Sequence, residues 1–257
     1  MTETTTTKEK ASNRSADRTA GTSPLVYARV AGFLLLFIVL IAPFSQLYVP
    51  STLIVTGDAT ATANNIGASG WVLHLGIVGD SLVFLIEIVL TALLYVLLRP
   101  VSRTLSLIAA FARLAMTIIQ GINLLAYFTA LLLLSGAAYL TVFGPAQLDA
   151  LALLSLNAHQ YGVYVWEAFF GLHLFVLGYL IFKSGYFPRI LGVLMVFAAL
   201  GYLTHSYGSW LYPNYAETLA SVVGITAIIG ELPFFLWLAI KGVNVQRYNE
   251  RAQQQPR

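Results

Sequence analysis

The sequence contains six long apolar segments, and these most constrain what the chain can fold into. Each segment is close to or longer than the ~20 apolar residues that cross a hydrocarbon core about 30 Å thick. The chain is 58% hydrophobic and 10% charged, whereas about a quarter of a soluble domain is charged. We therefore predict an all-α polytopic membrane bundle of six transmembrane helices. The predicted spans are residues 25–48, 71–98, 104–135, 159–182, 190–207 and 217–240.

The basic residues lie on one side of the predicted membrane. All fourteen Lys and Arg residues precede or open the first segment, accompany the connections after the second and fourth segments, or follow the sixth. The connections at about 49–70, 136–157 and 209–216 contain none. Because cytoplasmic segments retain Lys and Arg, this pattern places both termini in the cytoplasm. The net charge of +3 then reflects topology, and we expect no nucleic-acid partner.

Three further segments flank or interrupt the predicted transmembrane domain at 25–242. Residues 1–24 are rich in Thr, Ser and charged groups, which predicts a disordered cytoplasmic tail. Residues 243–257 are predicted to be a basic cytoplasmic tail. Residues 145–157 carry leucines at helical spacing and predict a short interfacial helix on the outer membrane surface.

Arg113 has two interpretations because the third apolar segment is unusually long. Its 32 residues span about 48 Å as a helix, which exceeds the hydrocarbon core. If the first turns project into the cytoplasm, Arg113 snorkels to the interface, and this is the interpretation we favour. If the span begins at residue 104, Arg113 is buried and needs a carboxylate partner, with Glu87 and Glu231 as candidates.

Seven polar residues inside the apolar segments form the candidate buried polar site. An ionisable group in a membrane helix is costly, so it tends to face the bundle or a cavity. At 1.5 Å rise per residue, the three glutamates lie about 15–24 Å from the basic residues that end their segments, inside the core. If they converged, burial and mutual repulsion would prevent all three from being ionised together. The seven are Asp80, Glu87, Gln120, Asn123, Glu167, His173 and Glu231.

These polar residues allow either a structural hydrogen-bond network or a working site. The sixth segment adds Pro233 two residues after Glu231, together with Gly224 and Gly230. Proline inside a helix removes a backbone hydrogen bond, so this segment is the candidate for a kinked or mobile element.

A metal site is a weaker hypothesis. Four candidate ligands lie toward the outer side, but no pair shows a ligand motif such as H-E-x-x-H. Cysteine is absent from the sequence, which excludes thiolate ligands and disulfides. We therefore predict no metal. The four candidate ligands are His74, Asp80, His159 and His205.

Several motifs resemble those of a known family. They are FFGLH at 169–173, SGYFPRILGVL at 184–194, LIVTGD at 53–58 and PNYA at 213–216. They resemble the DUF4386 family, a domain of unknown function in prokaryotic multi-spanning membrane proteins, over about residues 27–242. The resemblance implies the same architecture in the plasma membrane of a prokaryote. It implies no activity, catalytic residue or cofactor, and none is predicted.

Three functions remain open from the sequence. The first is an accessory or sensory membrane protein with a buried polar network, and we place it first. The second is a small proton-coupled transporter or permease that uses the mid-membrane carboxylates. The third is an intramembrane metal-dependent enzyme acting on a lipid-like substrate. Expected partners are membrane lipids and either a second copy of the chain or another membrane protein.

Overall fold

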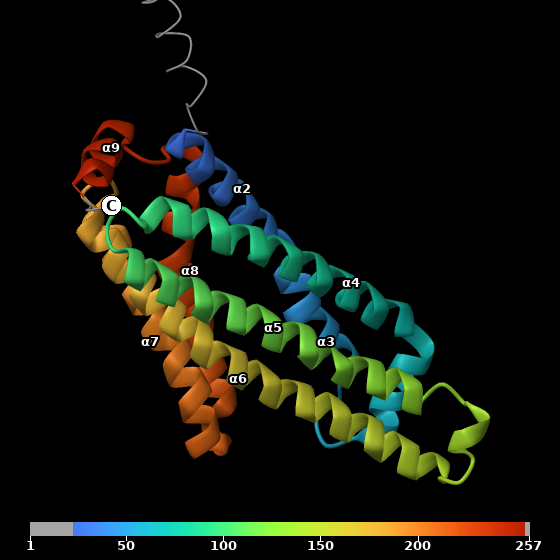
Figure 1. Ribbon diagram of the computed structural model, residues 1–257. Helices are drawn as coiled ribbons and strands as arrows, with labels where there is room; N and C mark the ends of the chain where they lie inside the picture. Colours follow the sequence, from blue (N-terminus) through green and yellow to red (C-terminus); the bar gives the residue numbers. More distant parts are fainter. Residues whose placement is uncertain (1–22, 255–257) are drawn as a thin grey trace, which may run out of the picture.

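The apolar segments form a bundle of helices, several of which are longer than the predicted spans (Figure 1). The computed structural model describes residues 23–254, and no strand occurs within that range. Six helical stretches there are long and apolar enough to cross a membrane, which confirms the polytopic α-helical fold. The helices are α2 (Pro24–Pro43), α3 (Val49–Leu53), α4 (Ala59–Leu98), α5 (Arg103–Leu133), α6 (Pro145–Ser184), α7 (Arg189–Leu211), α8 (Ala216–Ile240) and α9 (Val245–Gln253).

The predicted tails are only partly covered. Most of the tail predicted at 1–24 lies outside the described residues. Within the tail predicted at 243–257, residues 245–253 form α9. The side chain of Asn244 caps this helix by accepting a hydrogen bond from the backbone N–H of Arg247 at 3.1 Å.

The predicted interfacial helix at 145–157 is wrong, because these residues are the first turns of α6. No glycine or proline interrupts the chain between Pro145 and Gly162, so the helix continues. Its first part also packs on the bundle. Leu156 is buried, and the hydroxyl of Ser155 donates to the carbonyl of Ala126 on α5 at 2.8 Å. Similarly, α4 begins at Ala59, twelve residues before the predicted span, and bends at Ser69.

The first span is not a regular α-helix throughout. After α2 ends at Pro43, residues Phe44–Tyr48 form a π-helical turn that leads into α3. A π-helical turn widens the helix and shifts the faces of the residues that follow. Here it buries Ser45 against α4. By contrast, α8 continues without a break through Pro233.

Close backbone contacts hold α6, α7 and α8 together. A Cβ atom at Gly178 of α6 would lie 2.7 Å from the carbonyl oxygen of Gly192 on α7. A Cβ atom at Gly230 of α8 would lie 2.6 Å from the carbonyl oxygen of Leu194 on α7. Small residues allow such approaches in membrane bundles, where tight packing drives association. The first helix, α2, closes the bundle by packing against both α4 and α8.

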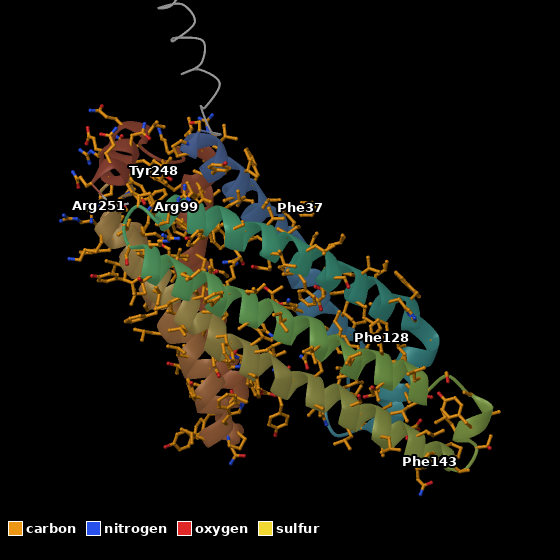
Figure 2. All side chains as sticks on the ribbon, in the orientation of Figure 1. Phe37, Arg99, Phe128, Phe143, Tyr248 and Arg251 are labelled. Atoms are coloured by element: carbon orange, nitrogen blue, oxygen red, sulfur yellow. The ribbon has the colours of Figure 1, made fainter. Side chains whose placement is uncertain are left out.

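We call the end of the bundle where α2 begins and α8 ends the terminal end, and the opposite end the distal end. Arg99, Arg251 and Tyr248 lie at the terminal end, whereas Phe143 lies at the distal end (Figure 2). Large apolar side chains such as Phe37 and Phe128 are exposed along the sides, as expected for surfaces that contact lipid.

At the terminal end, hydrogen bonds hold α9 and the α6–α7 connection on the end of α4. The hydroxyl of Tyr248 on α9 donates to the carbonyl of Val96 at 3.0 Å, and the hydroxyl of Tyr186 in the connection donates to the carbonyl of Leu97 at 2.7 Å. These bonds satisfy carbonyls near the end of α4, which lack helical partners. Burial raises the pKa of Tyr186 and of Tyr248, because a phenolate in this packed layer would lose its hydration.

A buried ionisable network as the candidate functional site

Three ionisable side chains meet in the interior of the bundle. Arg113 on α5 donates through Nε to the carboxylate of Glu87 on α4, and its Nη1 lies 2.9 Å from Nε2 of His173 on α6. All three are buried, with 2%, 6% and 1% of their surfaces exposed respectively, so each depends on the others for its hydrogen bonds. One interaction group therefore joins three helices.

The hydrogen bonds determine the tautomer of His173. Its Nδ1 lies 2.8 Å from the carbonyl oxygen of Ala109, which can only accept a hydrogen bond. Its Nε2 faces the guanidinium of Arg113, which can only donate. His173 therefore carries its proton on Nδ1 and is neutral. The group holds one positive charge on Arg113 opposite Glu87.

The interfacial interpretation of Arg113 is wrong. The helix begins at Arg103, so Arg113 lies ten residues inside α5 and faces Glu87 rather than the end of the bundle. Only 2% of its surface is exposed. The structure agrees with the other interpretation, in which Arg113 is buried and pairs with Glu87.

A second group includes the carboxylate of Glu231 on α8. The hydroxyl of Tyr202 on α7 donates to Glu231 at 3.0 Å. The ring of Tyr202 meets that of Phe170 on α6 edge to face, with centroids 4.8 Å apart. The guanidinium of Arg113 lies over the same Phe170 ring, 5.8 Å from its centroid. Phe170 therefore lies between the two groups and contacts one residue of each, Tyr202 and Arg113.

The third glutamate forms a pair of its own. Nδ1 of His205 on α7 lies 2.7 Å from the carboxylate of Glu167 on α6, and both residues are buried. The ring of Tyr164 packs edge to face on His205, with centroids 5.2 Å apart. The carboxylate orients the imidazole, which is a frequent arrangement around functional histidines.

The three glutamates do not share one binding point, but they are not independent. Each carboxylate has a different partner: Arg113, His205 or Tyr202. Tyr202 lies close enough to all three for their charges to act on it, and Arg113 and Glu87 are close enough to act on Glu231. A change of charge at one position is therefore felt at the others.

Asp80 belongs to a separate cluster nearer the distal end. The hydroxyl of Ser45 donates to Asp80 at 2.6 Å and the amide of Gln46 at 3.3 Å. Tyr127 lies within electrostatic range of Asp80, and its ring stacks on that of His159 with centroids 3.8 Å apart.

Asn123, also predicted for the buried site, contacts this cluster at the backbone of His159. Its side-chain amide donates to the carbonyl of His159 at 2.9 Å. Gln120, three residues earlier on α5, is buried, and its Oε1 has no hydrogen-bond partner within residues 23–254.

The weakly predicted metal ligands are not brought together. His74 is exposed and its Nδ1 lies 2.8 Å from the carbonyl of Gly70 on its own helix. Asp80, His159 and His205 belong to the contacts described above. In the part of the chain that the structure describes, no three His, Asp or Glu side chains gather as a metal site would require.

Several residues of these groups escaped the sequence reasoning. They are Ser45, Tyr127 and Tyr202, together with the pairing of Glu167 with His205. The sequence did contain a pattern that indicates which face of α5 is buried. Polar residues recur on this helix every seven positions and so lie on one helical face. They are Ser106, Arg113, Gln120 and Tyr127.

Comparison with known proteins agrees with this architecture. The family described as "Domain of unknown function (DUF4386)" matches residues 30–242. The chain belongs to the DUF4386 family. It is also 33% identical over 166 residues to an uncharacterized protein of Archaeoglobus fulgidus, an alignment that covers 65% of this chain and 83% of the archaeal protein. No solved structure shows significant similarity to the chain.

The match to DUF4386 includes every helix that contributes to the ionisable network. Residues 30–242 contain all of α4 to α8, and hence Glu87, Arg113, His173, Glu167 and Glu231. The N-terminal cap of α2 and the whole of α9 lie outside it. The family supplies the membrane architecture and leaves the chemistry of the network to be argued from its geometry.

Proposed function

We propose that this protein is a sensory membrane protein whose buried network responds to the availability of protons. The observation that carries the proposal is the pairing of ionisable groups from different helices inside the bundle. Gain or loss of a proton there changes the contacts between helices rather than those of one helix alone. A buried charge that biases the arrangement of packed helices is the usual form of such a switch.

Glu231 is the position we propose as the sensor. Its carboxylate is bound by the neutral hydroxyl of Tyr202, whereas Glu87 and Glu167 are bound by Arg113 and His205. Among residues 23–254, a negative charge on Glu231 thus has no cation in direct contact, and protonation changes the charge of the interior. Glu231 adjoins Gly230, where the backbones of α7 and α8 touch. The proposed response is a change in the packing of α8 on α7.

The output of this response lies at the terminal end. Helix α8 leads through Gly242, which has a positive φ of 67°, directly into α9. A glycine in this conformation ends the helix and sets the direction of α9. Movement of α8 would therefore change how α9 rests against Tyr186 and the end of α4.

The distance between α7 and α8 tests the proposal. Since the chain has no cysteine, spin labels can be placed at Ile190→Cys and Ile240→Cys, two exposed positions at the terminal end. In lipid nanodiscs over about pH 5–8, the distance distribution should change with pH. Glu231→Gln should abolish the change, whereas Glu217→Gln, an exposed acid on the same helix, should preserve it. An unchanged pH response in Glu231→Gln would exclude Glu231 as the sensor.

Transport is the second candidate, favoured by the position of Pro233 two residues after Glu231. Helices weakened beside buried carboxylates occur at the ion sites of many transporters, and Pro233 removes one backbone hydrogen bond although α8 continues past it. A pH-sensitive dye inside proteoliposomes distinguishes the two functions. Steady proton uptake that Glu231→Gln abolishes would favour transport, whereas a conformational response without uptake supports sensing.

We also propose that the protein lies in the plasma membrane of a prokaryote with both termini in the cytoplasm. The proposal is supported by the basic residues of the terminal end. An impermeant thiol reagent on intact cells should label Val142→Cys, in the exposed distal loop, and not Gln246→Cys on α9. Labelling of Gln246→Cys and not of Val142→Cys would show that the termini lie outside the cytoplasm.

The proposed partners are membrane lipids and either a second copy of the chain or another membrane protein, because a sensor must pass its response on. Native mass spectrometry of the gently solubilised protein would identify retained lipids and the number of copies. A lipid-free monomer that still responds to pH would speak against both partners.

A further inference from the structure

The buried face of α5 carries polar residues across the whole hydrocarbon core. Ser106, Arg113, Gln120 and Tyr127 follow one another at intervals of seven residues and are 2%, 2%, 7% and 2% exposed. From Ser106 to Tyr127 the helix rises about 32 Å, which is close to the thickness of the core. We call these four residues the α5 polar face.

Two atoms of the α5 polar face have hydrogen-bonding capacity that the protein does not use. Among residues 23–254, three buried side-chain atoms lack a partner: Oγ of Ser106, Oε1 of Gln120 and Oγ of Ser209. A buried polar group without a partner is costly, so such atoms in native proteins usually bind water.

The surroundings of Ser106 have room for water. A cavity of about 10 Å³ is lined by Ser106 and His173 together with side chains of α4, α5 and α6. This volume is about the least that holds one water molecule. Ser106 lies three residues into α5 from Arg103, so the cavity lies between the terminal end and the Glu87–Arg113–His173 group.

Between Ser106 and Gln120, the gaps along the α5 polar face are short enough for single waters. Ala109, whose carbonyl accepts from His173, lies between Ser106 and Arg113. Thr117, buried at 4%, lies between Arg113 and Gln120, and its hydroxyl donates to the carbonyl of Arg113 at 2.9 Å. From Ser106 to Gln120, polar groups therefore occur about once per helical turn, a spacing of about 5 Å that one bridging water can close.

We infer that the α5 polar face is hydrated from Ser106 to Gln120, with ordered water bound at these two residues, and that this water gives protons access to the Glu87–Arg113–His173 group from the terminal end of the bundle. Each water accepts one proton and releases another, so protons are passed along and none is consumed. The permanent charge of Arg113 repels an excess proton, as arginines do in water pores. The hydrated stretch therefore reaches Arg113 without forming a continuous leak across the bundle.

The hydration of α5 stands by itself, whereas its use for proton access rests on the proposed sensory function.

Two methionines provide the test. Met116 lies on α5 between Arg113 and Gln120, whereas Met195 lies on α7; both belong to the same apolar cluster and are similarly buried, at 2% and 1%. Hydroxyl radicals generated from water by X-ray pulses oxidise side chains that lie next to bound water.

In the wild-type protein in nanodiscs, Met116 should be oxidised several-fold faster than Met195. Gln120→Leu, which keeps the size and removes the amide, should lower the oxidation of Met116 toward that of Met195. Thr129→Val, which removes an exposed hydroxyl from the same helix, should leave the ratio unchanged. Circular dichroism of each variant confirms that it is folded. Equal oxidation of the two methionines in the wild type would overturn the inference, as would a ratio that Gln120→Leu does not alter.

The α7–α8 distance measured on the same samples separates this inference from the proposed function. If Met116 is protected while the distance still responds to pH, the hydration inference fails and the sensor stands. If Met116 is oxidised as expected while the distance is unaffected by pH, the face is hydrated and the sensory function fails.

Discussion

Removing Glu87 should cost far more stability than removing the pair it forms with Arg113. Glu87→Gln leaves the guanidinium buried at 2% exposure with His173 as its remaining side-chain partner. Arginine cannot lose its charge in a protein, so the charge stays uncompensated. Breaking a buried ion pair from one side costs about 3–5 kcal/mol. Because His173 still accepts one hydrogen bond, we expect the lower limit, about 3 kcal/mol.

The opposite substitution should be milder. In Arg113→Gln, Glu87 can be neutralised by taking up a proton, so we expect a loss of about 1–2 kcal/mol, close to that of an ordinary buried hydrogen bond. With both residues changed to glutamine, no charge is buried, and stability should return to within about 1 kcal/mol of the wild type. The coupling energy of the cycle is then about 3–5 kcal/mol, at or above the upper end of the range for residues in direct contact.

Reversible unfolding by SDS in mixed micelles measures these free energies. Glu217→Gln, an exposed acid on α8, serves as the control and should change stability by less than about 0.5 kcal/mol. If the double variant loses as much stability as the sum of the single variants, Glu87 and Arg113 are not energetically coupled. The description of this group as a paired charge in the interior would then be refuted.

Two further predictions concern packing and the terminal end. Gly178→Val places side-chain atoms where the carbonyl of Gly192 lies 2.7 Å from a Cβ, and should lower the free energy of SDS unfolding by about 1–3 kcal/mol; Gly224→Ala, which meets open space, should not lower it. Burial raises the pKa of Tyr248 above its ordinary value of 10.0. The folded state thus holds the proton more tightly, so this contribution to α9 docking is complete below about pH 10 and is lost as pH rises further. Amide hydrogen exchange of α9 should show that loss, and Tyr248→Phe should remove its pH dependence.

The sequence predicts the fold better than it predicts the site, for a physical reason. The bilayer requires long apolar helices, and this requirement is written in local composition. It therefore identified the spans at 190–207 and 217–240 to within a few residues of α7 and α8. It failed at 145–157 because membrane thickness sets only a minimum length. A helix without a breaking residue continues beyond the core, as α6 does.

The site depends on which helix faces meet, which composition does not specify. The sequence identified Glu167 and His205 as polar residues in separate spans, but their pairing depends on how α6 crosses α7. Arg113 shows what periodicity could have added. Ser106 and Gln120, seven residues before and after it, place it on the face of α5 that packs inward. The distance of Arg113 from the start of the apolar segment was the less informative measure.

The unequal lengths of the helices give the molecule the geometry of a lever. Helix α6 has 40 residues, about 60 Å, whereas α7 and α8 have 23 and 25 residues, about 35 and 38 Å. All three reach the terminal end, so the excess of α6 extends beyond α7 and α8 at the distal end (Figure 1). His173 and Glu167 lie in the half of α6 that α7 covers, where a tilt would begin. From there α6 extends about 33–42 Å to its distal tip, so a tilt of about 10° would move that tip by about 6–7 Å. A small rearrangement among buried side chains would thus produce, besides the change at α9, a displacement at the distal end that is large enough for another molecule to detect outside the bilayer.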